Sequence, residues 1–257
     1  MGFVDSIPLW MFFVGAIPFS LVFLELGFRQ GKRRRLTNAD ESDAPVGAIV
    51  GGVLALLAFM LAFTFSLASS RFDERRHLVL DEANAIGTLY LRADFVDEPG
   101  KSNIRLMLRR YIQLRLDAAA HPEHIESEMR ETGAIQQRLW SEAVKLAQQK
   151  PTPVTSLFIS SLNDVIDFHE KRVITAFYTR VPETVWAGLL VVTALAMLAV
   201  GFYVGQNGKR EWVATLVLIT SFSTVLLLVA DLDRPYQGFL RVSQKPMFDT
   251  AKQIGAQ

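Results

Sequence analysis

The stretch LAFTFSLASSRFDERR, residues 61–76, joins an apolar segment directly to a run of charged residues. No Gly or Pro separates the two parts, so no signal ends the helix that the apolar part predicts. A helix that only anchors a protein has no need to continue beyond the bilayer. The stretch therefore predicts one long helix that leaves a membrane and lines a water-filled vestibule.

Composition narrows the class of protein. The chain has 257 residues, no cysteine and a formal net charge of +1, and half of its residues are hydrophobic. The lack of cysteine excludes disulfides, thiolate metal sites and a cysteine nucleophile. The near-zero net charge gives no global attraction to nucleic acid, so we expect no nucleic-acid partner. The apolar residues collect near both ends, which favours a membrane protein with one soluble segment.

Four apolar segments are long enough to cross a bilayer, which takes about 20 residues of helix. We predict an all-α membrane protein with two N-terminal and two C-terminal transmembrane helices flanking a soluble helical bundle. The expected spans are Ile7–Phe28, Val46–Ser69, Thr184–Gly205 and Trp212–Ala230. The expected division of the chain is 1–70 with two spans, 71–183 soluble, 184–230 with two spans, and 231–257 as a tail.

The second span is rich in Gly, Ala and Ser, which let helices approach closely in lipid, so we expect protein on several of its sides. Phe59 and Phe63 lie four residues apart and share one helix face. Spacing alone favours ordinary packing for the two rings, with pore lining as the alternative. Glu25, near the end of the first span, is interpreted as reaching toward the basic loop, with a lining or pairing role as the alternative.

The polar middle of the chain predicts helices only. One should continue from the second span to about residue 93, followed by helices at about 103–120, 122–149 and 154–180. In the last of these, Phe158, Leu162, Val165 and His169 recur at helical spacing. Such an apolar stripe among charges favours a bundle or a subunit interface.

A search for catalytic chemistry gives little. The chain lacks phosphate-binding, dinucleotide-binding, nucleophile-elbow and zincin motifs, so we do not expect an enzyme. Histidines lie near acids at Glu74 and His77 and around His169, and we interpret these groups as solvated helix faces. Asp231 and Asp233 follow the last span and precede a turn. A helix stop explains them, and a hard cation such as Ca²⁺ is the alternative.

Two stretches resemble the bestrophin-like family of membrane proteins and, more distantly, the bestrophin ion channels. They are FTFSLASSRFDERRHLVLDEANAIGTLYLR (63–92) and LDRPYQG (232–238). The resemblance covers essentially the whole chain in layout and implies a homo-oligomer, a pentamer, that conducts inorganic ions through a central pore. Its compact layout suits the inner membrane of a bacterium, with the lipid bilayer as a partner.

The resemblance assigns roles to named residues. Ala55, Phe59 and Phe63 match the apolar neck of the pore, and Arg71 follows eight residues beyond. Ala55 is smaller than the usual neck residue, so the neck is expected to be shorter or wider. Below it, Arg71, Asp73, Glu74 and Arg75 are the expected charged vestibule, and their mixed signs leave ion preference open. The turn after the last span, with Asp231, Asp233, Pro235, Tyr236 and Gly238, resembles the Ca²⁺-binding segment of bestrophins. It lacks the long acidic run of that segment.

Two interpretations are possible both for the membrane orientation and for the function. The basic residues of the loops between paired spans favour a cytosolic position for those loops, whereas the resemblance places the helical middle in the cytosol. The alternative function is a non-conducting membrane scaffold whose soluble helices bind a partner. A second span covered on its small-residue face by its own subunit would favour the scaffold.

Overall fold

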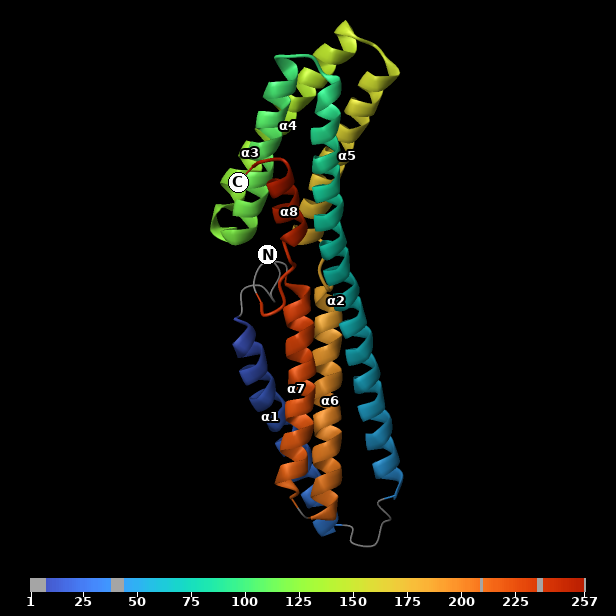
Figure 1. The fold of residues 1–257 in the computed structure, drawn as a ribbon. Coiled ribbons are helices and arrows are strands. Elements are labelled where there is room, and N and C mark those ends of the chain that lie inside the picture. Colours follow the sequence, from blue (N-terminus) through green and yellow to red (C-terminus); the bar gives the residue numbers. More distant parts are fainter. Residues whose placement is uncertain (1–7, 38–43, 209, 235–237, 257) are drawn as a thin grey trace. The chain divides into compact units, whose positions relative to one another are not determined.

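A computed structural model describes residues 8–37, 44–208, 210–234 and 238–256 (Figure 1). These residues form helices and connecting segments, and no strand occurs among them. The helices are α1 (Leu9–Thr37), α2 (Ala44–Arg92), η2 (Ala93–Phe95), α3 (Gly100–Ala120), η3 (Pro122–His124), α4 (Ile125–Gln149), α5 (Pro153–Phe177), α6 (Glu183–Asn207), α7 (Trp212–Asp233) and α8 (Lys245–Gln253).

Four helices are long and apolar enough to cross a membrane: α1, α2, α6 and α7. The predicted all-helical class and the four apolar spans are therefore confirmed. One difference lies at the end of α5, which was expected to continue to residue 180. It ends at Phe177, because Arg180 and Val181 instead bind the last residue of α7.

Helix α2 runs without a break for 49 residues, through Arg71 and on to Arg92 (Figure 1). At 1.5 Å per residue this helix is about 70 Å long. The hydrocarbon core of a bilayer is only about 30 Å thick. The prediction of one helix that continues well beyond its apolar part is confirmed.

The chain forms two compact units. The first comprises Met1–Arg71 and Arg180–Leu240, and the second comprises Phe72–Thr179 and Arg241–Gln257. Helix α2 contributes its apolar half to the first unit and its polar half to the second. The C-terminal residues are split between the two, since those after Leu240 pack with the second unit.

Glycines hold α1 against α6 in the first unit. A Cβ atom added to Gly27 of α1 would collide with the backbone oxygen of Leu198 in α6. The reverse contact sets Gly201 of α6 against the backbone oxygen of Leu24 in α1. The same arrangement repeats one turn further along at Gly31 and Gly205. The two helices therefore touch backbone to backbone, as small residues allow in membrane proteins.

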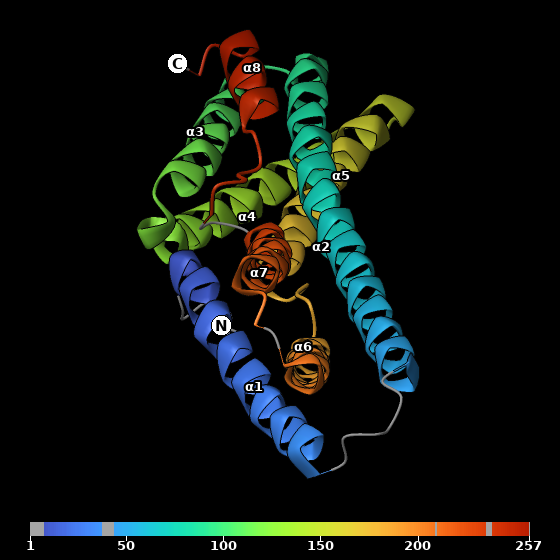
Figure 2. The ribbon, with the colours of Figure 1, turned by 90° about the horizontal axis from the view of Figure 1, so that it is seen from below.

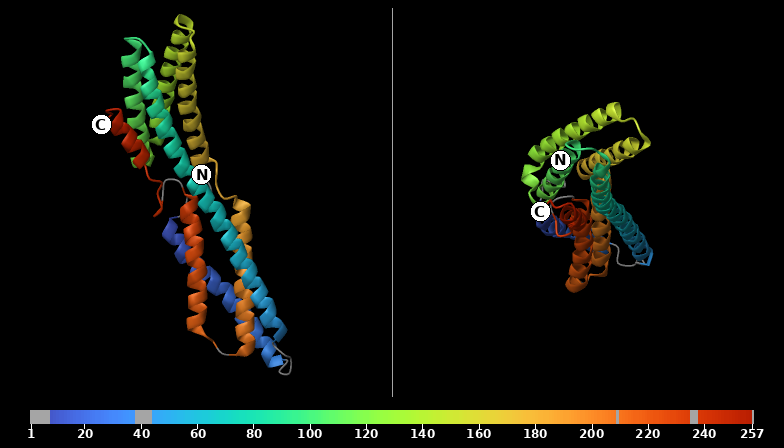
Figure 3. Two further views of the ribbon diagram at one scale, coloured as in Figure 1. Left: turned by 45° about the vertical axis from the view of Figure 1, so that its right-hand side comes forward. Right: turned by 45° about the horizontal axis from the view of Figure 1, so that its top comes forward.

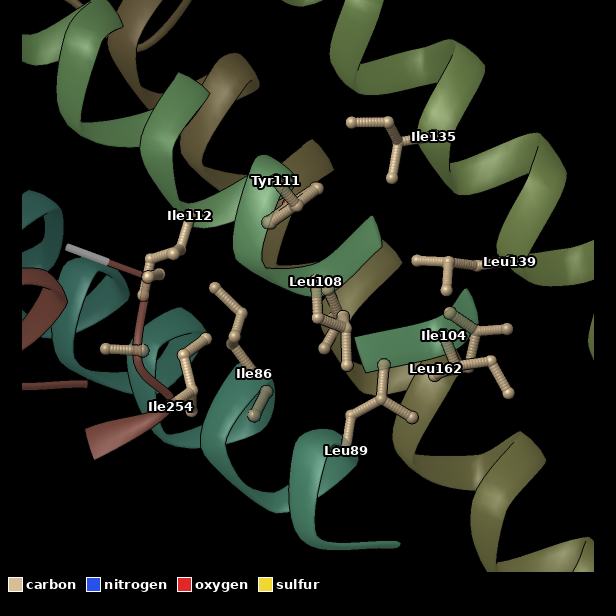
Figure 4. Packing of buried hydrophobic residues seen from close by; sticks show 14 of the residues in the cluster. Ile86, Leu89, Ile104, Leu108, Tyr111, Ile112, Ile135, Leu139, Leu162 and Ile254 are labelled. Carbon is tan, nitrogen blue, oxygen red and sulfur yellow. The ribbon is translucent and has the colours of Figure 1, made fainter. Parts of the chain in front are cut away.

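The second unit has one apolar core, to which α2, α3, α4, α5 and the C-terminal segment contribute (Figure 4). Ile86, Leu108 and Leu162 are fully buried in it. Helix α8 lies beside α3 (Figure 2 and Figure 3). The Arg109 side chain donates to the Ile254 carbonyl at 2.8 Å and fixes this segment to α3.

Candidate functional site on helix α2

The apolar half of α2 has two different faces. Leu57, Leu61 and Ala68 are almost fully buried, with at most 3 % of each residue exposed. On another face, Phe59 is 69 % exposed and Phe63 is 60 % exposed. Two large aromatic rings four residues apart are therefore left open by the packing within one chain.

The exposed face continues along the polar half of the helix. We define the α2 stripe as the exposed or partly exposed residues within about 60° of the direction of Phe59, at about 100° per residue. Its members are Ala48, Gly52, Ala55, Leu56, Phe59, Ala62, Phe63, Ser66, Ser70, Asp73, Glu74, His77, Leu80, Asp81, Asn84, Thr88, Leu91 and Arg92. The stripe is apolar up to Phe63, small and polar at the two serines, and acidic around His77, and Arg92 ends it.

The four residues predicted for a charged vestibule do not share this face. Asp73 and Glu74 are exposed and belong to the stripe. Arg75 is only 7 % exposed, and Arg71 is partly buried. At about 100° per residue, Arg71 and Arg75 point about 120° and 160° away from Phe59. The mixed signs read from the sequence therefore separate into an acidic stripe and two arginines off it.

The small residues at the start of α2 are also open. Neither Gly51 nor Gly52 has a described heavy atom within 4 Å of an added Cβ atom, apart from its own neighbours. Ala55, Ala58 and Ala62 are exposed as well. The expectation that protein surrounds this helix on several sides is not met within one chain. The tight glycine contact of the first unit lies between α1 and α6 instead.

The two acids at the end of the last span accept hydrogen bonds from backbone amides. Both carboxylate oxygens of Asp231 accept amide hydrogen bonds, from Phe239 at 2.8 Å and from Leu240 at 3.0 Å. Asp233 Oδ1 accepts from the Val181 amide at 2.9 Å. These contacts support the helix-stop interpretation, in which Asp231 holds the segment after α7 and Asp233 holds the segment before α6.

A cation at this turn stays a prediction. No group of three or more His, Cys, Asp or Glu side chains suited to a metal ion occurs within the described part of the chain. Two other residues of the proposed turn, Pro235 and Tyr236, lie outside the described residues.

A buried charge cluster in the second unit joins three helices. Glu82 of α2 is fully buried, and its Oε1 accepts from the Tyr111 hydroxyl of α3 at 2.7 Å. Arg115 Nε, also of α3, lies 3.2 Å from the same oxygen. Arg172 of α5 donates to Glu82 Oε2. One carboxylate thus ties α3 and α5 to the polar half of α2.

His169 lies at the edge of this cluster. Its Nδ1 is 3.8 Å from Glu82 Oε1, and its ring meets Tyr111 edge to face. His169 is only 4 % exposed, so the expectation that it belongs to a solvated face is wrong. Burial and the nearby Glu82 carboxylate hold the pKa of the Tyr111 hydroxyl well above its ordinary value. Tyr111 therefore stays a neutral donor.

The sequence around Glu82 carries a signal of its own, which is an acid on an apolar helix face. Val79, Ala83 and Ile86 are all buried and surround Glu82 at helical spacing. An acid on an apolar face is costly unless it is paired, so its position alone predicts a buried cation partner. The identity of that partner does not follow, because Arg115 and Arg172 are far away in the sequence.

In the first unit, Glu25 points toward basic residues as expected and also pairs with them, which was the alternative. Its carboxylate lies 3.0 Å from Arg29 and 3.0 Å from Arg210. The Arg210 guanidinium lies 3.9 Å from the centre of the Phe28 ring. Glu25 is therefore held by Arg29 of its own helix and by Arg210, which lies just before α7.

Comparison with known proteins identifies the family of this chain. The family model of the Bestrophin-like domain matches residues 14–247. The chain belongs to the Bestrophin-like family. The predicted resemblance is thereby confirmed, and the four apolar helices make this Bestrophin-like chain an integral membrane protein. No protein in a search of curated proteins matches it.

Solved structures share the fold of this Bestrophin-like chain. A bacterial Bestrophin homologue from Klebsiella pneumoniae with a point mutation is 17 % identical, with 96 % and 97 % of the two chains covered and a TM-score of 0.65. A second mutant is 18 % identical, with 94 % of each chain covered and a TM-score of 0.63. A structure of the homologue phased with zinc has 17 % identity, 95 % and 94 % coverage and a TM-score of 0.62.

Proposed function

We propose that copies of this chain form an ion channel in which α2 of each copy lines the pathway. The observation that carries the proposal is the α2 stripe, an exposed face that stays on one side of an unbroken helix. In a closed ring of copies, one face of each α2 turns toward the axis. The family and the fold shared with bacterial Bestrophin homologues support this assembly.

The apolar part of the stripe is the proposed neck. Phe59 and Phe63 place two aromatic rings on successive turns, and Ala55 precedes them by one turn. A narrow apolar constriction resists hydrated ions because water leaves it easily. Phe59 and Phe63 therefore control passage, and the small side chain of Ala55 leaves a wider opening on its side.

Beyond the neck, the proposed pathway is acidic. Asp73, Glu74 and Asp81 lie on the stripe, whereas Arg71 and Arg75 point away from it. Rings of carboxylates favour cations in channels. The proposed substrates are therefore inorganic cations, which the mixed charges in the sequence did not indicate.

The assembly follows from the resemblance as a homo-oligomer, a pentamer, in the bilayer of a bacterial inner membrane. The scaffold alternative expects α2 to be covered by its own subunit on its small-residue face. Gly51 and Gly52 are open instead, with no described heavy atom near an added Cβ atom beyond their own neighbours. This openness favours a face reserved for other copies and for the pathway.

Flux through proteoliposomes tests the proposal, with Phe59→Ala compared with Phe65→Ala. Phe65 is a matched control because it lies on the same helix, is 39 % exposed and points about 120° from Phe59. We expect cation flux in the wild type, a clear increase in Phe59→Ala and little change in Phe65→Ala. Equal effects of the two variants would contradict the neck, and silence of all three folded proteins would contradict the channel.

A further inference from the structure

We infer that His77 makes the cation preference of the pathway depend on pH. The inference rests on the proposed channel and extends it to a residue that sets ion choice. Of the four histidines of the chain, His77 alone lies on α2. It is exposed and belongs to the acidic part of the α2 stripe.

The position of His77 on the helix is the first argument. His77 follows Phe59 by 18 residues, which at 3.6 residues per turn is five full turns. Its side chain therefore leaves the helix in the same direction as Phe59, about 27 Å further along the axis. If Phe59 faces the pathway, His77 faces it as well.

The surroundings of His77 are the second argument. Asp73 and Glu74 precede it by one turn, and Asp81 follows it by one turn. The nearest basic residue in sequence, Arg76, points about 100° away. Within the described part of the chain, His77 makes no hydrogen bond, ion pair or ring contact. The charged groups that face it are thus the three carboxylates of its own helix.

The other histidines differ in placement. His169 is buried beside Glu82, and His121 and His124 contact each other at a ring distance of 5.8 Å near the end of α3. None of these three lies on α2. His121 and His124, at the far end of α3, therefore provide controls for effects of pH elsewhere in the molecule.

The charge change of a histidine matters at this distance. Histidine side chains change charge between about pH 5 and pH 8. One helical turn is about 5.4 Å, which is shorter than the Debye length of about 8 Å at 0.15 M salt. A proton on His77 therefore offsets part of the field of Asp73, Glu74 and Asp81. In a ring of copies this loss is repeated in every subunit, so acidification weakens the preference for cations.

The test is the ratio of potassium to chloride flux in proteoliposomes at pH 8 and at pH 6. We expect this ratio to fall about threefold in the wild type as the pH is lowered, because one charge in the lining changes within screening distance. His77→Gln should keep the high ratio at both pH values. His77→Arg should show the low ratio at both, and His121→Gln should behave like the wild type.

The outcomes separate this inference from the channel itself. A pH response that persists unchanged in His77→Gln and His77→Arg would overturn the role of His77 while leaving the channel intact. A ratio in the wild type that does not change with pH would do the same. Absence of flux from folded wild-type protein would overturn the channel and, with it, the basis of this inference.

Discussion

Replacement of Glu82 by Gln should lower the stability of the second unit more than replacement of any other acidic side chain in that unit by its amide. Glu82 is fully buried and contacts Arg115 at 3.2 Å, Tyr111 at 2.7 Å and Arg172. Glutamine keeps one oxygen that can accept from Tyr111, but it removes the only negative charge of the cluster among the described contacts. Arg115 and Arg172 then both lose the buried negative charge with which they pair.

The magnitude follows from that loss of pairing. Breaking a buried ion pair by removing one partner costs about 3–5 kcal/mol of unfolding free energy. In a chain of this size, about 1 kcal/mol moves the melting temperature by about 2–4 °C. We therefore expect the apparent melting temperature of purified Glu82→Gln to fall by about 6–20 °C. Fluorescence-detected thermal unfolding in one detergent, at one heating rate, measures this change.

Glu131→Gln is the matched control for Glu82→Gln. Glu131 also binds an arginine, Arg110, through two hydrogen bonds of 2.8 and 3.0 Å, but both side chains are about half exposed. Exposed pairs contribute about 0–1 kcal/mol, so its melting temperature should change by only a few degrees. Equal shifts in the two variants would refute the reasoning. A double change of Glu82 and Arg172 should cost less than the sum of the single changes, because one charge pair is removed as a unit.

Two further predictions concern the first unit. Gly201→Ala should destabilise the protein by about 1–3 kcal/mol or more in thermal unfolding, because the added methyl group meets the Leu24 backbone. Gly15→Ala is the control and should be neutral or slightly stabilising, because no described atom lies near its added Cβ beyond its own neighbours. Asp231→Asn should lower the melting temperature, since Asp231 accepts two amides, yet a chelator of divalent cations should leave that of the wild type within about 1 °C. A larger fall with the chelator would instead indicate a cation at this turn.

Much of the fold follows from local patterns in the sequence. Each of the four spans can be predicted from its run of apolar residues alone. The absence of Gly and Pro between Leu61 and Arg76 predicts the unbroken α2. The helices of the middle region end near the Pro and Gly residues that mark their limits. These features depend on neighbours in sequence, so single stretches are sufficient to predict them.

The arrangement around α2 depends on distant residues and could not be predicted in the same way. The stretch from Arg71 to Arg75 looks like a mixed charged ring, but the buried position of Arg75 is set by packing within the folded chain. The partners of Glu82 lie 29 to 90 residues away. Likewise, small residues occur both on α2 and at the α1–α6 contact. Only the fold shows that those on α2 are exposed, whereas those of α1 and α6 are packed against each other.

The central claim is that the α2 stripe faces the ion pathway, and single cysteines test it most directly. The chain has no cysteine, so Ser66→Cys, Ser70→Cys and Ala68→Cys each introduce the only thiol. Ser66 and Ser70 lie on the exposed stripe, whereas Ala68 is fully buried. A positively charged thiol reagent should change flux through the two serine variants and leave Ala68→Cys unaffected. Modification that alters flux equally at all three positions, or at none of them in a conducting protein, would contradict the claim.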